Sequence, residues 1–499
     1  MPDYSAADTL LRNDFTQASK FANRATYGGN PDVVARIQEI GPLAWMDEQK
    51  LLSVPNYFDT QTANGDLGYS YLIWDHAFEH PAQLQQRMAF ALSWILAMAS
   101  SNVKQFRAAD YVDRMHADAL TNFRTLIERI SLSQAMAEFL SYDGNLPADP
   151  AKAQYPDENY AREIMQLFTI GLWELNQDGT RVRVNGEDVP TYDQDDILGM
   201  ARVFTGWKGT GFVTNQNEDL TLTEANHEDG EKTFLGVTIP AGTGGYESLT
   251  IALDTLFQHP SCAPFICHKL VQRYVTSNPT PAYIARVTAV WADNGAGVEG
   301  DLFEVLKAIL LDSEALQTSP PDTFGKYREP VMIFTAIGRA LHLTSTAERF
   351  AIGATNSPNL LAQSPFRPPN VFSYSDHYFI PVGTPIGEAG LYSPEADFQG
   401  ADTALARVEW LQKTFYRPPN GLTYGPGFDA LKALASTPAA LVDELERRIC
   451  PGALSAATKQ TIVNSLVTTG DGSSDTSQYN RVTAAAVQIG VATDGIYER

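Results

Sequence analysis

The sequence predicts a mainly α-helical fold, a multi-helix bundle or helical array with small β-hairpin insertions and long irregular loops. Apolar residues recur at helical spacing along most of the 499 residues, and Gly and Pro interrupt this pattern at short intervals. Alternating, strand-like patterns are brief. Because the chain exceeds the roughly 250–300 residues at which a single core stops growing, we expect two or more packed subdomains.

The first helices are marked by their start and stop residues. Asn30 is a predicted N-cap before Pro31, Gly41 stops the helix, and Pro42 begins the next one. The apolar stretch from Met88 is shorter than the roughly 18 residues of a membrane span, so it predicts a buried helix and no membrane-spanning segment. Further helices are predicted near residues 66–79, 82–100, 105–120, 122–141, 157–172, 193–206, 246–258, 262–276, 280–293, 300–311 and 326–343.

Three stretches break the helical pattern. "TRVRV" between Asp178-Gly179 and Asn185-Gly186 predicts a short hairpin. The stretches at 206–246 and 363–400 are long loops, which in compact domains usually carry function, and the three together could wall a cleft. We divide the chain into an N-terminal helical region at 1–150, a central helical region with the candidate site at 151–345, and a loop with C-terminal helices at 346–499.

Charge and cysteine content exclude several classes of protein. The net charge of −23 repels phosphate backbones, so no nucleic-acid partner is expected, and it suits a secreted or marine protein kept soluble by charge. Three cysteines cannot form a disulfide framework. The N-terminus lacks a leader-like pattern, so the protein stays inside the cell or its leader is absent from this chain.

A polar stripe runs along the predicted helix at 157–172. One arc contains Asn159, Arg162, Glu163 and Gln166, flanked by Glu158, and apolar residues fill the opposite side. Three interpretations stay open: a solvated face with a Glu158–Arg162 pair, a buried ion network between helices, or a cleft. In the cleft, Glu163 or Glu158 is a catalytic acid or base and Arg162 holds an anionic group.

The loop "NHEDGEKTF" adds further candidates. His227 and Asp229 could take part in catalysis or ligate a metal, and Lys232 could bind substrate beside Asn159. Asp193 and its neighbours could supply further metal ligands, but no complete ligand spacing is present, so we predict no metal site. The sequence requires no cofactor, although a divalent metal stays open. The alternative makes Asp193 a helix N-cap and His227 a turn residue.

Aromatic residues near the loops suit sugar stacking, because an aromatic face complements the apolar C–H faces of a sugar. Trp207 and Tyr374 are the predicted stacking residues, and Arg367 in "FRPPN" is a predicted anion contact. Trp173 and Tyr378 are further candidates. Core packing is the alternative for each Trp, and His268, on an apolar helix, is interpreted as a core residue.

Several motifs occur in the order seen in one known family. They are "FANRATYGG", "ENYAREIMQLFTIGL", "YDQDDILGMARVFTGW", "NHEDGEKTFLG", "HPSCAPFICHKLVQRYV" and "FRPPNVFSY". Over roughly residues 20–380 the chain resembles the DUF1800 family, bacterial proteins of unknown function. The resemblance implies an extracytoplasmic, periplasmic or secreted protein, often encoded beside a DUF1501 partner. Where members often have "HTLG", this chain has Phe168-Thr169-Ile170-Gly171.

Two functions follow as hypotheses. The first is an enzyme acting on a polysaccharide or related glycan, a hydrolase or lyase with acid and base carboxylates. The second is a non-catalytic binding or assembly protein that acts with a DUF1501-type partner. For the polar stripe we expect Arg162 and Glu163 to be shielded from water and to contact one of the loops, with Lys232 and His227 facing Glu163 and Asp229 facing Arg162.

Overall fold

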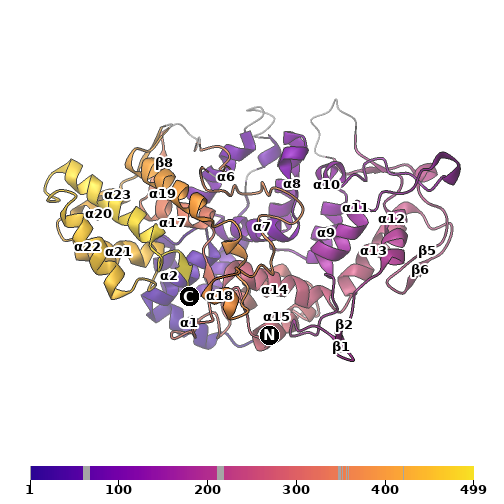
Figure 1. The fold of residues 1–499 in the computed structure, drawn as a ribbon, viewed down its shortest axis with the longest axis horizontal. Helices are drawn as coiled ribbons and strands as arrows, with labels where there is room; N and C mark the ends of the chain where they lie inside the picture. The colour runs from indigo at the N-terminus through magenta and orange to yellow at the C-terminus, as the bar shows by residue number, and fades with distance from the viewer. Residues whose placement is uncertain are drawn as a thin grey trace.

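The computed structural model confirms a mainly α-helical protein with small two-stranded sheets. The structure describes the whole chain except residues 1, 55, 60–67, 211–217, 347–349, 351, 356, 358 and 420. The molecule is elongated, with the C-terminal helices at one end (Figure 1). Within the described residues, no helix has the length and apolar character needed to cross a membrane.

The N-terminal part is built from consecutive helices that pack on their neighbours. They are α1 (Ser5–Asn13), α2 (Phe15–Ala25), α3 (Pro31–Ile40), α4 (Pro42–Lys50), α6 (Gly68–Phe78), α7 (Gln83–Ile95), α8 (Gln105–Asp118), α9 (Phe123–Ser131) and α10 (Gln134–Phe139).

The central part alternates helices with short strands. Its helical elements are α11 (Asn159–Glu163), the π-helical segment η3 (Ile164–Thr169), α12 (Gln194–Val203), α13 (Gly245–Gln258), α14 (Cys262–Tyr274), α15 (Pro281–Ala292), α16 (Leu302–Leu310) and α17 (Pro330–Ala340). Its antiparallel hairpins are β1 (Arg183–Val184) with β2 (Glu187–Asp188), β3 (Trp207–Lys208) with β4 (Thr221–Leu222), and β5 (Lys232–Phe234) with β6 (Val237–Ile239).

The C-terminal part is a helical bundle joined back to the rest of the molecule by two further sheets. Its helices are α18 (Pro385–Glu388), α19 (Ala401–Tyr416), α20 (Gly427–Ala433), α21 (Pro438–Ile449), α22 (Ala456–Val467) and α23 (Asp475–Val491). The sheets pair β7 (Lys326–Tyr327) with β10 (Tyr497–Glu498), and β8 (Leu343–Ser345) with β9 (Leu422–Tyr424).

The predicted start and stop signals locate real helix ends. The Asn30 side chain accepts a hydrogen bond from Val33 N at 2.9 Å, and Gly41 ends α3 with φ of 88°. Asp193 caps α12, where it forms a capping box with Asp196. The Asn185-Gly186 turn of the β1–β2 hairpin has positive φ at both residues, as that turn type requires.

Other expectations need correction. The predicted helix at 122–141 is two helices, because Ser133 adopts extended backbone and caps α10. The predicted helix at 326–343 begins only at Pro330, because residues 326 and 327 form strand β7, which pairs with β10. The stretch at 206–246 is not a plain loop, since it carries β3 to β6. Residues 66–67 and 211–217 of the predicted elements lie outside the described residues.

The N-terminal part of the chain contacts the C-terminal part and the central helix α17. Helix α2 contacts α21, and Arg24 forms a 2.8 Å ion pair with Glu498 of β10. Gly28 allows the chain to lie against α17, since a Cβ there would sit 2.6 Å from the Cα of Ala336. All three cysteines are free and buried.

Candidate functional site

The polar stripe of α11 is half solvated and half buried. Arg162 and Glu158 form a 3.2 Å ion pair with side chains 39% and 35% exposed. Gln194 of α12 donates to Glu158 at 2.8 Å and accepts from Arg162 at 3.4 Å. Asn159 is exposed. The expectation that Arg162 is shielded and held by a loop is therefore wrong, because its partners are α11 and α12.

Glu163 is buried, as expected, with 8% of the residue exposed. Burial raises the pKa of its carboxyl group, and the nearby charge of Arg162 only partly offsets this. Among the described residues, Oε2 of Glu163 has no hydrogen-bond partner. The structure thus makes this carboxyl group harder to ionise than an exposed one.

The residues of "NHEDGEKTF" have partners of their own. His227 contacts Thr205 O at 3.0 Å and Ser248 Oγ at 3.3 Å through its two ring nitrogens. Lys232 is buried and donates to Gly230 O at 3.4 Å, whereas Asp229 is exposed. These contacts hold the loop together and leave it without the predicted contacts to Glu163 and Arg162.

Helix α12 explains why this loop does not reach the polar stripe. It contacts α11 and also β5, the strand that begins at Lys232. The close approach of β5 depends on Gly199, since a Cβ there would lie 1.8 Å from Thr233 O. Arg202 of α12 meets Glu228 at 3.5 Å. Within the parts of the chain described, no group of three or more His, Cys, Asp or Glu is arranged to hold a metal ion.

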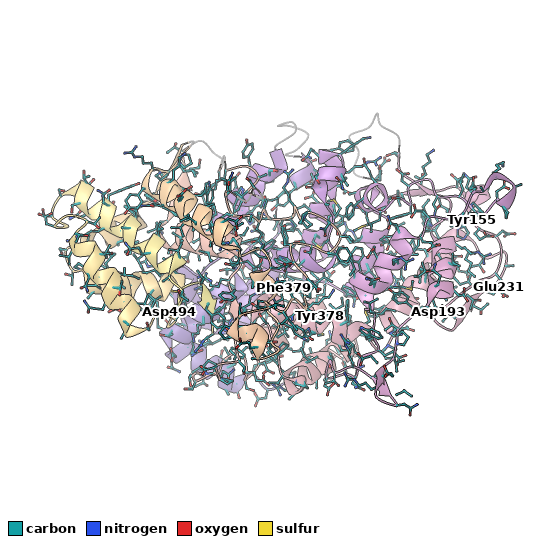
Figure 2. All side chains as sticks on the ribbon, viewed as in Figure 1. Tyr155, Asp193, Glu231, Tyr378, Phe379 and Asp494 are labelled. Atoms are coloured by element: carbon teal, nitrogen blue, oxygen red, sulfur yellow. The ribbon has the colours of Figure 1, made fainter. Side chains whose placement is uncertain are left out.

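A cleft of about 990 Å³ opens elsewhere in the central part. The end of η3, the segment leading into β1, helix α14 and the loop around 369–397 form its walls. The first and third of the predicted irregular stretches therefore do wall a cleft, and 206–246 is not in its lining. Figure 2 shows the cleft residue Tyr378 near the middle of the molecule, with Asp193 and Glu231 toward one end.

Aromatic rings dominate the lining of this cleft. Trp173, Phe372 and Tyr378 are exposed, and Tyr378 packs edge-on against Tyr392 with ring centroids 5.4 Å apart. The remaining aromatic lining residues are Trp94, Phe265 and Tyr374. Exposed rings in a hollow are available for a ligand to stack on.

The predicted stacking and anion-binding residues divide between cleft and core. Tyr374 lines the cleft, and its hydroxyl accepts from Arg367 N at 3.0 Å and donates to Ser364 O. The Arg367 side chain donates to Ser70 Oγ at 2.9 Å and is not part of the lining. Trp207 is buried, and its indole donates to Val203 O at 3.3 Å, so Trp207 is a core residue.

Two basic groups of α14 lie at the cleft. Lys269 is 3% exposed, and burial lowers the pKa of its ammonium group to about 7. It donates to Leu167 O at 3.0 Å and lies 4.0 Å from the Phe265 ring centroid. His268 stacks on Tyr378 and lines the cleft, so it is not the pure core residue expected; burial lowers its pKa to about 4.

Two carboxylates line the same cleft. Asp376 is exposed and accepts a hydrogen bond from Tyr378 N at 2.9 Å. Burial raises the pKa of Asp397, and the charge of Asp376 raises it further, against a hydrogen bond from the backbone of residue 376. Asp397 is also exposed, and the two carboxyl groups interact electrostatically, so both are available for acid–base chemistry with a ligand in the cleft.

A buried ion cluster holds the carboxylate-bearing loop in place. Glu395 is fully buried and pairs with Lys326 at 2.9 Å and with Arg273 at 3.1 Å. Arg273 also lies over the ring of Trp94, a cleft residue, at 4.1 Å. Asp397, two residues beyond Glu395, is thereby tied to α14.

Comparison with known families assigns the chain to one of them. The family described as "Protein of unknown function (DUF1800)" matches residues 20–491, which is nearly the whole chain. The chain belongs to the DUF1800 family. The match extends past residue 380, near which the resemblance ends, and includes most of the C-terminal bundle of this DUF1800 protein. No curated protein and no solved structure matches the chain.

The sequence predicted the aromatic cleft residues Trp173, Tyr374 and Tyr378 as stacking candidates. The charged residues of the cleft were missed, because each has an ordinary explanation in sequence. Lys269 sits in "CAPFICHKLVQRY", where it resembles a surface lysine on a helix. Two features of the sequence could have indicated the cleft: the polar pair His268-Lys269 inside an apolar helix, and Asp376-His377 inside the aromatic stretch "FSYSDHYFI". The polar stripe was the stronger signal, yet only its last polar residue, Gln166, lines the cleft.

Proposed function

We propose that this DUF1800 protein is a glycan-active enzyme, a hydrolase or lyase, that binds a polysaccharide in the 990 Å³ cleft. The observation that carries the proposal is the occurrence, in one hollow, of exposed aromatic rings and two carboxylates. Large apolar clefts with a few polar groups are the usual sites of ligand binding. Stacking rings and acid–base carboxylates are what glycoside chemistry requires.

The two carboxylates divide the chemical roles. Asp397, whose pKa is raised, is the proposed acid that donates a proton to the glycosidic oxygen as the C–O bond breaks. Asp376 is the proposed base or nucleophile at the anomeric carbon. In the hydrolase, water supplies the incoming oxygen and its released proton returns to a carboxylate. In a lyase, the base instead takes a proton from the sugar ring as the C–O bond breaks and a C=C bond forms, so atoms and charge balance in both cases.

This proposal moves the acid–base role away from the polar stripe. Glu163 is buried outside the cleft lining, and Glu158 is held by Arg162 and Gln194 on the surface of the helix pair. His227 and Asp229 lie in a different loop, beyond α12. We propose no catalytic role for these four residues.

Cleavage of a glycan panel by the full chain tests the proposal. Release of new reducing ends should fall about 100-fold or more in Asp397→Asn and in Asp376→Asn, the usual cost of losing an acid–base group. Asp32→Asn on α3, where the residue is exposed, is the matched control and should keep full activity. Unsaturated products would assign a lyase and saturated products a hydrolase.

Loss of activity in Glu163→Gln but not in Asp397→Asn would overturn the assignment to the cleft. Absence of cleavage across neutral and acidic glycans, with a folded protein, would overturn the enzyme proposal. In that case the second candidate applies.

The second candidate is a binding role with a protein partner, such as a DUF1501-type protein. It is favoured by apolar side chains exposed beside the cleft: Val382 is 92% exposed, and Ile380 and Phe372 are also exposed. Exposed apolar clusters mark interaction surfaces. Co-purification that is lost in Val382→Asp, without any glycan turnover, would support it.

We also propose an extracytoplasmic location, which rests on the typical export of DUF1800 proteins. Fractionation of the producing cells tests it. Recovery of the protein with periplasmic or secreted markers would support the proposal, and recovery with cytoplasmic markers would contradict it.

A further inference from the structure

Lys269 is a buried cation at the cleft without a counter-ion in the described residues. Its ammonium donates to one carbonyl oxygen, that of Leu167, and faces the Phe265 ring. No described carboxylate lies within 4.0 Å of it. Because burial of an unpaired charge is costly, an anion that enters the cleft would stabilise the protonated form of this group.

In the described part of the chain, four charged or titratable groups interact with Lys269. Asp376 of the facing loop raises its pKa, and Arg273, one turn further along α14, lowers it. His268 and His377 are both adjacent, and burial lowers the pKa of each imidazole. Neutral imidazoles do not compete with Lys269 for an anion.

The segment leading into β1 also brings positive charge to the cleft. Arg181 and Arg183 line it and share one carboxylate, that of Asp188, so the group keeps one net positive charge. Both guanidinium groups are more than 40% exposed, and that of Arg181 lies 5.4 Å from the ring centroid of Trp173. A cation fixed on an aromatic ring is oriented before a ligand arrives.

We infer that the cleft takes an acidic glycan whose carboxylate or sulfate group forms an ion pair with Lys269, while Arg181 contacts a second anionic group at the exposed rim. The inference rests on the proposed glycan-binding function and adds the substrate class. The positive charge in the cleft is opposite in sign to the net charge of the chain, which is −23.

Anion binding at Lys269 must depend on pH. The anion pairs with the protonated ammonium, whose pKa is about 7 in the free protein, and the pair raises that pKa. Binding therefore takes up a proton near neutral pH. Affinity should fall as pH rises above 7, provided the glycan itself stays ionised.

Calorimetric titration of the full chain tests the inference. The probes are an oligogalacturonate, a sulfated galactan oligosaccharide and a neutral cello-oligosaccharide of equal length. We expect the acidic probes to bind about 10- to 100-fold more tightly than the neutral one at pH 6, as for one charge-assisted contact. This preference should shrink at least about tenfold at pH 9.

Variants assign the effect to the named residues. Lys269→Met, which keeps the length and apolar stem, should remove the pH dependence and most of the acidic preference. Arg181→Gln, at an exposed position, should weaken the binding of both acidic probes and reduce the salt dependence of binding. Lys208→Met on β3 and Arg36→Gln on α3 are exposed controls that should change nothing.

The outcomes separate this inference from the function proposed above. Equal affinity for neutral and acidic probes, or an unchanged preference in both Lys269→Met and Arg181→Gln, overturns the acidic-glycan inference even if a neutral glycan is cleaved. Tight binding of acidic probes without cleavage supports the inference and contradicts the enzyme. Preference for the galacturonate assigns a carboxylate, and preference for the sulfated probe assigns a sulfate.

Discussion

The ammonium group of Lys269 on α14 donates a hydrogen bond to the carbonyl oxygen of Leu167 on η3 at 3.0 Å. This contact joins the polar-stripe segment to the wall of the cleft. A π-helical turn at this point fits a functional role, because π-helical turns occur frequently at functional sites.

Replacement of Lys269 by Met should stabilise the protein at neutral and acidic pH. The folded-state pKa of about 7 lies below the ordinary value of 10.5, so the unfolded chain binds more protons between these values. The wild type therefore gains stability as pH rises from 7 to 10.5, on the order of a few kcal/mol. Denaturant unfolding across this range should show that slope in the wild type and lose it in Lys269→Met; parallel slopes would contradict the burial of the ammonium.

Loss of the Glu395 charge should destabilise the loop that carries Asp397. Burial raises the pKa of Glu395, but Lys326 and Arg273 together lower it below its ordinary value, so its contribution to stability is lost at acid pH. Glu395→Gln leaves two buried cations short of a partner and should cost about 3–5 kcal/mol. Glu39→Gln, an exposed pair with Arg36, should cost less than about 1 kcal/mol.

Gly199→Ala should separate β5 from α12. The new Cβ would lie 1.8 Å from the carbonyl oxygen of Thr233, a backbone atom that cannot move without shifting the strand. We expect a loss of about 2 kcal/mol or more in the free energy of unfolding, in the range of overpacking. Gly425→Ala meets only an ordinary 3.5 Å contact and is the control; equal stability of the two variants would show that β5 does not pack as described.

Glu163→Gln should leave glycan cleavage unchanged. The variant should be more stable than the wild type at pH 8, and this difference should shrink at pH 4. The raised pKa of Glu163 means that its charged form destabilises the folded state, and this penalty disappears once the carboxyl is protonated in both states. Thermal unfolding at the two pH values measures the difference. A large loss of activity with unchanged binding would restore Glu163 as the catalytic acid.

Local signals predicted much of the fold. Asn30, Gly41 and Asp193 mark helix ends in the structure, and the Asn185-Gly186 turn forms its hairpin, because capping and turn formation depend on neighbouring residues. The break at Ser133 escaped prediction, since Ser is common both inside helices and at their caps.

The candidate site was predicted less well than the fold. The polar stripe correctly indicated a partly buried helix. Its neighbours, however, depend on α12, which contacts both α11 and β5. The close approach of α12 to β5 is set by tertiary packing at Gly199. Lys269, Asp376 and Asp397 meet across segments more than 100 residues apart. No periodicity within a single segment can report such a meeting.

A crystal structure of Asp397→Asn with a bound acidic oligosaccharide would locate the substrate in the cleft or elsewhere. We predict sugar rings stacked on Trp173 or Tyr378, an anionic group within hydrogen-bond distance of Lys269 Nζ, and a glycosidic oxygen beside residue 397. An oligosaccharide bound instead beside Glu163 or at "NHEDGEKTF", with the cleft empty at saturating concentration, would contradict the claim that the substrate binds in the cleft.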